Sequence, residues 1–300
     1  MNILAIDIGG SAVKYACSDG AGNLSGNGRF PVPATLEELI QQVAELFHSV
    51  NAEGLAVSSP GAVDPRTGIV GGISAVPYLH GPSIRERFES VLHAPTEMEN
   101  DANCAALAEL WKGNARQLND CCFVILGTGI GGAIIKDRKI HRGAHNQAAE
   151  FGLLFSDCEL DTADYHVWSH YSSVHTVRNV SQESGIPEEQ LSGAVIFDEA
   201  DRNPLYARHT ARFYRALAIG LLEIQQFYDP EAILLGGGIS ARADLIENIY
   251  ASMDTLMGRF RSVFVIPELR KCAFGNDANL IGAVFHYLSR RNQMSITPPK

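Results

Sequence analysis

The chain has 300 residues, a length that fits two medium-sized domains better than one large domain. Its side chains are 46% apolar and 19% charged, a composition typical of a globular enzyme. The net charge of −10 and the scattered Lys and Arg residues argue against a nucleic-acid partner, and no helix-turn-helix segment precedes the first predicted strand. No apolar run reaches the roughly 18 residues of a membrane span. Residues 1–8 lack the basic leader of a signal peptide, so we expect a cytoplasmic protein without a membrane partner.

Apolar runs and glycine turns predict a first half that begins with strands. We expect strands at residues 2–8, 12–17 and 24–30, with a turn at Gly9 and Gly10. Thr35 and Ser83 are each followed three residues later by Glu, the pattern of a capping box, and predict helices that end near Val50 and Leu92. Further strands are expected at residues 54–58 and 96–98, and a helix at 102–112.

The second half begins in the same style. A strand is predicted at residues 121–126, a glycine turn at 127–132 and a returning strand at 133–136. Helices follow at about 167–184 and 205–228, then a strand at 232–235 and helices at 243–258 and 278–290. This weak internal repeat predicts a two-domain α/β fold, divided within the polar stretch 113–119 into residues 1–115 and 116–277.

The first glycine turn has the residue types of a phosphate site. Gly9 and Gly10 allow backbone N–H groups to approach a phosphate, while Ser11 adds a hydroxyl and Lys14 a positive charge. Asp7, at the strand end, suits Mg²⁺ held directly or through water. A plain β-turn explains the same residues, so this motif alone leaves both interpretations open.

Two more glycine clusters follow predicted strands. The second turn combines four glycines with a hydroxyl donor: Gly127, Thr128, Gly129, Gly131 and Gly132. A strand follows it and no Lys-Ser/Thr pair does, so it is neither a Rossmann fingerprint nor a Walker A loop. The third cluster is Gly236, Gly237 and Gly238. Together the three clusters indicate one nucleotide, such as ATP, in a cleft between two domains.

Polar residues at other predicted junctions suit a hydroxylated substrate. Asp101 can accept a proton from a substrate hydroxyl and Asn100 can hydrogen-bond a neighbouring one, although either residue also suits a helix cap. Three residues after a predicted strand can contact a sugar or form an ordinary turn: Ser59, Pro60 and Gly61. Glu150, between small residues, is either a substrate ligand or a surface carboxylate.

Histidine and cysteine patterns predict no metal centre. His166, His170 and His175 lack a Cys or Glu constellation nearby, which favours a structural role over a metal site. The six cysteines include no Cys-x-x-Cys pair, so we expect reduced thiols.

The motifs together resemble the ROK family of sugar kinases, transcriptional repressors and open reading frames, over nearly the whole chain. Asp7-Ile-Gly-Gly-Ser-x-x-Lys14 is similar to the family's first phosphate motif, with Ser11 where Thr is commoner. Glu99-Asn-Asp-Ala-Asn103 is similar to its catalytic motif. Residues 126–134, followed by Gly143, Ala149 and Gly152, match the family signature, and residues 235–240 resemble its adenosine-side motif.

The resemblance implies the two-domain α/β fold of the actin/hexokinase-like ATPases, which is ribonuclease H-like, with the last helix, about 278–292, packing back on residues 1–115. It implies an ATP-dependent sugar kinase in which Asp101 is the general base for the sugar's 6-hydroxyl. Asn100, Asp101 and Glu150 then bind sugar hydroxyls, Asp7 serves Mg²⁺, and the glycine turns hold ATP. A homodimer is implied as well.

Two departures from the family pattern bear on the substrate. Leu153 stands where the family usually has a His that binds zinc and contacts the sugar, and only Cys158 remains of a three-cysteine zinc motif. We therefore expect no zinc. The β-glucoside kinase branch shares these losses. An apolar side chain in place of an imidazole donor leaves room for an aglycone, so we expect a kinase for a β-glucoside or related hexose.

Three alternatives remain. A free-hexose or N-acetylhexosamine kinase would have the same motifs. A non-catalytic sugar sensor of the family is disfavoured by the missing DNA-binding segment and the intact Asp7 and Asp101. A sugar-independent ATPase of the same fold is disfavoured by the polyol-binding groups of residues 99–103.

Overall fold

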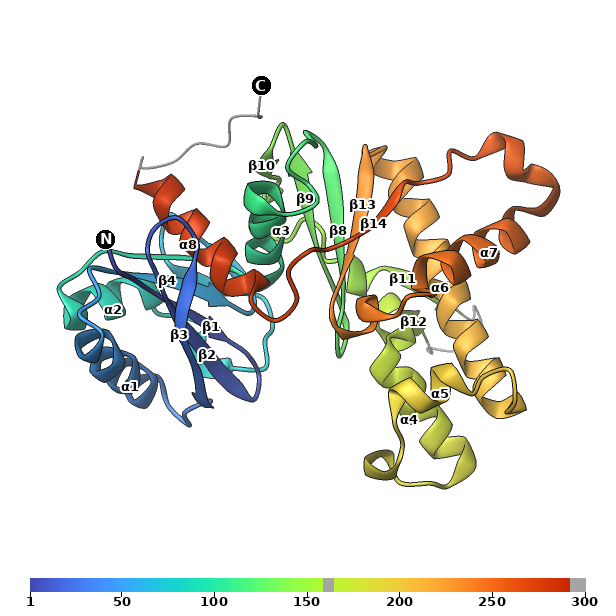
Figure 1. Ribbon diagram of the computed structural model, residues 1–300, viewed down its shortest axis with the longest axis horizontal. Helices are drawn as coiled ribbons and strands as arrows, with labels where there is room; N and C mark the ends of the chain where they lie inside the picture. Colours follow the sequence, from blue (N-terminus) through green and yellow to red (C-terminus); the bar gives the residue numbers. More distant parts are fainter. Residues whose placement is uncertain (159–164, 292–300) are drawn as a thin grey trace. The chain divides into compact units, whose positions relative to one another are not determined.

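The computed structural model describes residues 1–158 and 165–291, which divide into two compact units (Figure 1). The first unit comprises Met1–Gln117, Arg138–Ala148 and the chain from Ala273 onward. The second comprises Leu118–Asp137 and Ala149–Cys272. The first unit is therefore assembled from three separate stretches of the chain, and the second from two stretches that are divided by residues 138–148.

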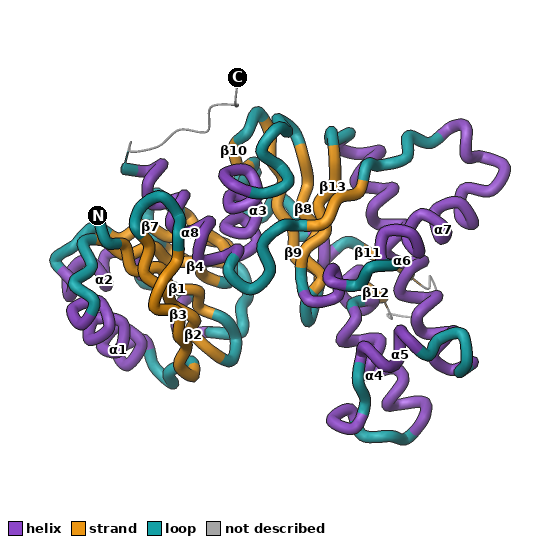
Figure 2. The backbone as a smooth tube through the Cα atoms, viewed as in Figure 1, coloured by secondary structure: helices purple, strands orange, loops and turns teal. Residues whose placement is uncertain are grey.

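The first unit is built on a sheet with the strand order β3-β2-β1-β4-β7 (Figure 2). Its strands are β1 (Ile3–Ile8), β2 (Ala12–Ser18), β3 (Leu24–Pro31), β4 (Gly54–Ser59) and β7 (Thr96–Asn100). β1, β2 and β3 are antiparallel, whereas β4 pairs parallel to both β1 and β7. β1 and β4 are buried along their whole length because helices cover both faces of the sheet, which explains the apolar runs at residues 3–6 and 55–57.

Alternate residues of β1 contact different helices. Leu4 and Ile6 join the core formed with α1 (Leu36–Ser49) and α2 (Ile84–Leu92). Ile3 and Ala5 join the core formed with α3 (Asp101–Lys112) and α8 (Ala278–Arg290). As the sequence predicts, the Thr35 and Ser83 side chains cap α1 and α2 by accepting from the backbone N–H groups three residues later. Shorter elements are β5 (Ala62–Asp64), β6 (Ile69–Gly71), a 3₁₀ helix at Pro77–Leu79 and β10 (Lys139–Ile140).

Helices α3 and α8 pack closely against each other. A Cβ added at Gly282 of α8 would lie 1.7 Å from the carbonyl oxygen of Cys104 in α3, so only glycine fits there. At the other end of α3, the buried Glu109 carboxylate accepts backbone N–H groups from Ala273 and Phe274. Glu109 thereby fixes the backbone that leads into α8.

Within the second unit the strand order is β9-β8-β13-β14. These strands are β8 (Cys121–Leu126), β9 (Ile130–Lys136), β13 (Ala232–Gly236) and β14 (Leu269–Lys271), and a separate hairpin joins β11 (Phe155–Cys158) to β12 (Tyr165–Val167). The helices are α4 (Ser173–Ser184), α5 (Gly193–Asp198), α6 (Pro204–Tyr228) and α7 (Leu245–Met257). The 3₁₀ helices are Phe151–Leu153, Trp168–Tyr171, Glu188–Gln190, Gly238–Ala241 and Gly258–Val263. The long helix α6 supplies much of the core, including Phe213, Leu217 and Leu221.

Two sequence predictions in this unit are wrong in detail. The predicted helix at 167–184 begins only at Ser173, because the Ser172 side chain caps α4 and the buried Trp168 lies in a preceding 3₁₀ helix. The predicted glycine turn is shorter than residues 127–132, since β9 already begins at Ile130.

Two findings concern the expected environment of the chain. No helix within residues 1–158 and 165–291 combines the length and apolar character of a membrane span. Within the described residues, the following cysteines form no disulfide: Cys17, Cys104, Cys121, Cys122 and Cys272. The side chain of Cys158, on which the zinc expectation falls, lies outside the described part of the chain.

Candidate active site

Asp7 lies at the end of β1 beside the end of β4. The Ser58 hydroxyl donates to Asp7 Oδ1 at 2.7 Å, and the Asn279 amide donates to the same oxygen at 3.0 Å. Asp7 is only 6% exposed, and Lys14 is its partner in the β1–β2 register. Asn279 is not among the site residues predicted from the sequence, although residues 276–279 repeat the Asn-Asp-Ala-Asn of residues 100–103.

The first glycine turn is a short hairpin between β1 and β2. The backbone N–H of Gly9 donates to the carbonyl of Ala12 at 3.0 Å. A Cβ on Gly10 would come within 3.0 Å of the Ala75 side chain, so a glycine relieves crowding there. The Ser11 side chain is exposed next to this turn. The hairpin therefore leaves Gly10 and Ser11, which are predicted to bind phosphate, at the surface of the first unit, while the Gly9 N–H is engaged within the turn.

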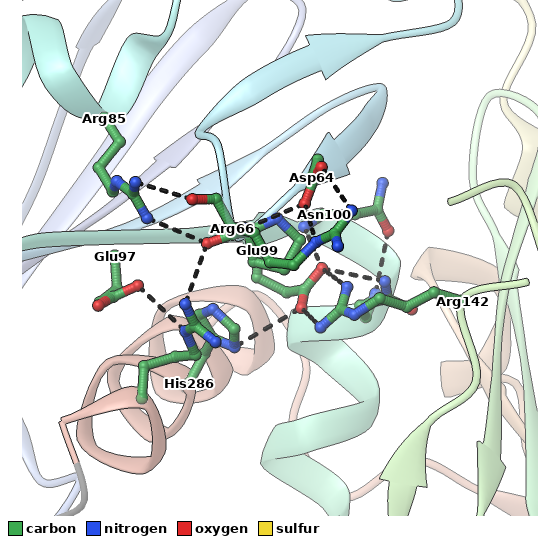
Figure 3. A network of polar contacts seen from close by, with 11 residues as sticks. Asp64, Arg66, Arg85, Glu97, Glu99, Asn100, Arg142 and His286 are labelled. Atoms are coloured by element: carbon green, nitrogen blue, oxygen red, sulfur yellow. Dashed lines mark hydrogen bonds and ion pairs between the residues drawn. The ribbon is translucent and has the colours of Figure 1, made fainter. Parts of the chain in front are cut away.

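An ionic network around the buried Glu99 lies next to Asn100 (Figure 3). Glu99 is fully buried at the end of β7, and Arg142 binds both of its carboxylate oxygens, at 2.8 Å for Nη1 to Oε1. Glu99 Oε1 also accepts the Asn100 backbone N–H at 2.8 Å and the Asn103 amide at 3.1 Å. His286 Nδ1 of α8 lies 3.6 Å from Oε2.

The charge state of this network follows from burial and hydrogen bonding. Burial alone would raise the pKa of the Glu99 carboxyl, but the Arg142 hydrogen bonds and neighbouring charges hold that pKa below its usual value. Burial lowers the pKa of His286 to about 4, so its imidazole is neutral near pH 7. Glu99 and Arg142 thus form a buried ion pair that fixes the junction of β7 and α3.

Asn100 is the cap of α3 and also connects two parts of the predicted sugar site. Its Oδ1 accepts the Asn103 backbone N–H at 3.1 Å, and its Nδ2 donates to Gly61 O at 3.0 Å and to Asp101 Oδ1 at 2.9 Å. Both amide N–H groups of Asn100 are therefore engaged within the protein. The amide oxygen accepts one hydrogen bond from Asn103 and has a second lone pair for a ligand. Asp101 Oδ1 also accepts the Ala102 N–H at 2.8 Å, which orients the carboxylate.

The Ser59-Pro60-Gly61 turn lies against the same junction. Gly61 has a φ of +90°, and a Cβ there would lie 2.8 Å from the Val70 side chain, so glycine is required. The buried Ser59 hydroxyl donates to the carbonyl of Pro60 at 3.2 Å. The structure thus brings Gly61, Asn100 and Asp101 together in the first unit.

The second glycine turn is supported by two serines. Its backbone closes through Gly127 N donating to Gly129 O at 3.0 Å. Ser172, the cap of α4, donates to Thr128 O at 2.7 Å, and Ser169 Oγ accepts the Ile130 N–H at 3.0 Å. Neither serine was singled out from the sequence, because each is close to the turn only in the folded chain.

The other predicted glycines have different structural reasons for lacking a side chain. Gly131 and Gly132 lie within β9, and a Cβ on Gly132 would come within 2.3 Å of the Phe151 ring, so packing explains that residue. Gly237 has a φ of +88°, and a Cβ there would lie 2.1 Å from Leu126 O, which makes glycine necessary between Gly236 and Gly238.

Glu150 and the residues after it lie in the second unit. Glu150 immediately precedes the 3₁₀ helix Phe151–Leu153 and is exposed, although nearby protein atoms raise the pKa of its carboxyl by desolvation. Leu153 and Phe155 are 64% and 69% exposed. Two apolar side chains within five residues of Glu150 are therefore accessible to solvent.

The three histidines lie close together without forming a metal site. The ring centroids of His166 and His170, and of His170 and His175, are 5.7 Å apart. Burial lowers the pKa of His175, and its Nδ1 lies 3.0 Å from Ser172 Oγ. In the described part of the chain, no group of three or more His, Cys, Asp or Glu residues is arranged to hold a metal ion.

Comparison with known proteins assigns the family. The profile described as the ROK family matches residues 3–289. This chain belongs to the ROK family. It is 32% identical to the beta-glucoside kinase of Klebsiella pneumoniae over 99% of this chain and 98% of that protein. It is also 32% identical to the beta-glucoside kinase of Listeria innocua over 98% of this chain and 99% of that protein.

The structural comparison agrees. A ROK family protein from Streptococcus pneumoniae, solved in complex with sucrose, is 35% identical with a TM-score of 0.89, covering 98% of this chain and 100% of that one. The predicted actin/hexokinase-like α/β fold is confirmed. The predicted class, an ATP-dependent sugar kinase of the ROK family, is confirmed too, because kinases of this family match the chain along its whole length.

Proposed function

We propose that this ROK kinase transfers the γ-phosphoryl group of ATP to the 6-hydroxyl of a β-glucoside or a related hexose. The observation that carries the proposal is the oriented Asp101 carboxylate, held by Asn100 and by the Ala102 N–H at the start of α3. In the proposed step Asp101 accepts the hydroxyl proton as the sugar oxygen bonds to phosphorus and ADP departs. Glu99 and Arg142 hold the junction on which this carboxylate sits.

The proposed sugar ligands are Ser59, Pro60, Gly61, Asn100, Asp101 and Glu150. Asn100 would act through its amide oxygen, since both of its N–H groups are engaged with Gly61 and Asp101. Its sugar partner would then be a hydroxyl that donates. Because the amide also connects Gly61 to Asp101, sugar binding and the orientation of the base are linked through one side chain.

The proposed ATP ligands are the turn residues Gly9, Gly10, Ser11, Lys14, Gly127, Thr128, Gly129, Gly131, Gly132, Gly236, Gly237 and Gly238. Asp7 suits Mg²⁺, which prefers one or two carboxylates together with phosphate oxygens and water. Its Oδ1 accepts Ser58 and Asn279, and its Oδ2 receives no hydrogen bond from the described residues. When bound, Mg²⁺ would neutralise charge on the phosphates.

A β-glucoside is favoured over a free hexose for two reasons. Two relatives named beta-glucoside kinase are 32% identical to this chain, whereas relatives named glucokinase and N-acetyl-D-glucosamine kinase are 26% identical. The exposed Leu153 and Phe155 offer apolar surface to an aglycone rather than a hydrogen bond to a free anomeric hydroxyl. We also propose a cytoplasmic homodimer that needs no zinc and binds no nucleic acid.

The substrate proposal is tested by sugar-dependent ADP release with β-glucosides such as cellobiose, free hexoses and N-acetylhexosamines. Turnover of β-glucosides in preference to free hexoses supports it. Good turnover of free hexoses with none of β-glucosides contradicts it, and ADP release without any sugar would indicate an ATPase instead. Activity that survives dialysis against a zinc chelator, with Mg²⁺ restored, would support the zinc-free assignment.

The role of Asp101 is tested by Asp101→Asn. Loss of a general base costs about 10²- to 10⁴-fold in rate, while sugar binding should be largely kept. The matched control is Asp277→Asn, at the same position of the second Asn-Asp-Ala-Asn segment, where the side chain is exposed and makes no cap hydrogen bond. Wild-type turnover in Asp101→Asn would remove Asp101 as the base.

A further inference from the structure

The tetrapeptide Asn-Asp-Ala-Asn occurs at residues 100–103 and again at 276–279, each time at the start of a helix. In the first copy the Asn103 amide donates to Glu99 at the end of β7, at 3.1 Å. In the second the Asn279 amide donates to Asp7 near the end of β1, at 3.0 Å. Both copies therefore use their last Asn to hold a buried strand-end carboxylate.

The two carboxylates differ in charge environment. Glu99 is paired with Arg142, whereas within residues 1–158 and 165–291 no Lys, Arg or His forms an ion pair with Asp7. The donors to Asp7 are a hydroxyl and an amide, which are both neutral, and both bind Oδ1. Two donors on one oxygen restrict rotation of the carboxylate without neutralising its charge.

We propose that Asn279 is a positioning residue for the metal–nucleotide complex. With Ser58 it fixes Oδ1 of Asp7, so that Oδ2 keeps one orientation toward the Mg²⁺ that accompanies ATP. This inference rests on the proposed assignment of Asp7 to Mg²⁺. Removing either neutral donor lets the carboxylate rotate away from the orientation that the metal requires, without changing the net charge of the site.

The test measures ADP binding by titration calorimetry with and without Mg²⁺, so it needs neither a sugar nor turnover. The variants are Asn279→Ala, Asn279→Leu, which keeps most of the volume, and Ser58→Ala. The control is Asn276→Ala, because Asn276 is an exposed residue of the same segment. A merely structural role would alter ADP binding equally under both conditions or lower the melting temperature alone.

We expect the gain in ADP affinity on adding Mg²⁺ to fall about tenfold or more in each variant, the effect of losing one hydrogen bond to a charged group. Metal-free ADP binding and the control should be unchanged. An unchanged gain in the folded Asn279 variants overturns the inference, and if they do not fold, an unchanged gain in Ser58→Ala does so. If the wild type shows this dependence but no sugar-dependent turnover, the proposed function fails while the inference stands.

Discussion

Replacing Arg142 by Met should destabilise the first unit by leaving a buried charge without its partner. Glu99 is fully buried and Arg142 binds both of its oxygens. Breaking a buried pair by removing one partner costs about 3–5 kcal/mol. Glu99 keeps the Asn100 N–H and the Asn103 amide, so we take the lower end, about 3 kcal/mol. For a unit of this size that corresponds to a fall in melting temperature on the order of 10 °C.

The pH dependence separates this charge effect from a loss of packing. In the wild type the pKa of Glu99 lies below its usual value, so its contribution to stability is present at neutral pH and is lost as pH falls through that folded-state pKa. In Arg142→Met, only the Asn100 and Asn103 hydrogen bonds still oppose the effect of burial, and we expect the folded pKa of Glu99 to rise above the unfolded one. The variant then gains stability relative to the wild type on acidification, and the deficit shrinks from pH 7 toward about pH 5.

Urea unfolding at the two pH values measures this deficit directly. The control is Arg87→Met, because Arg87 pairs at 3.0 Å with Glu37 on the surface, where both side chains are largely exposed. An exposed pair contributes about 0–1 kcal/mol, so the control should unfold almost as the wild type does. A deficit for Arg142→Met below about 1 kcal/mol, or one that is equal at both pH values, would refute the reasoning.

Two other predictions concern packing and the second glycine turn. Gly282→Ala should lower the free energy of unfolding by about 1–3 kcal/mol or more, since the added Cβ would lie 1.7 Å from a carbonyl oxygen of α3. Gly275→Ala should leave thermal unfolding nearly unchanged, because no neighbouring atom lies within 4 Å of a Cβ added there. Ser172→Ala should weaken ADP binding several-fold because Thr128 loses its support, whereas Ser192→Ala, which removes only the cap of α5, should not change that affinity. Equal ADP affinities in the two serine variants would contradict this role for Ser172.

Local patterns predicted much of the fold. The capping boxes at Thr35 and Ser83 placed two helix starts, because the cap depends on residues three apart in the chain. The last helix, predicted to begin at about residue 278 and to end at about 290–292, corresponds to α8. The predicted glycine turn ran too far because Gly132 is glycine to make room for Phe151, a contact that sequence spacing does not reveal.

The missing parts of the candidate site depend on long-range partners. Arg142 contacts Glu99 across 43 residues of sequence, and Asn279 contacts Asp7 across 272. Nothing in the immediate neighbours of Arg142 marks it as a partner of a buried carboxylate. The repeated Asn-Asp-Ala-Asn segment was the available signal for Asn279, and it becomes informative once both copies are seen to begin helices that pack together.

The closing of the first unit by α8 has a consequence for how the chain acquires its structure during synthesis. The face of β1 and β4 that includes Ile3, Ala5 and Ala56 is covered by Leu280, Ala283 and Val284. The ribosome makes these strands before all of the second unit's strands and before α8, so this face lacks its cover from α8 until the second unit has been synthesised. The nascent first unit therefore keeps part of its apolar core exposed during synthesis, while the second unit's strands β8, β9, β13 and β14 are all made before α8.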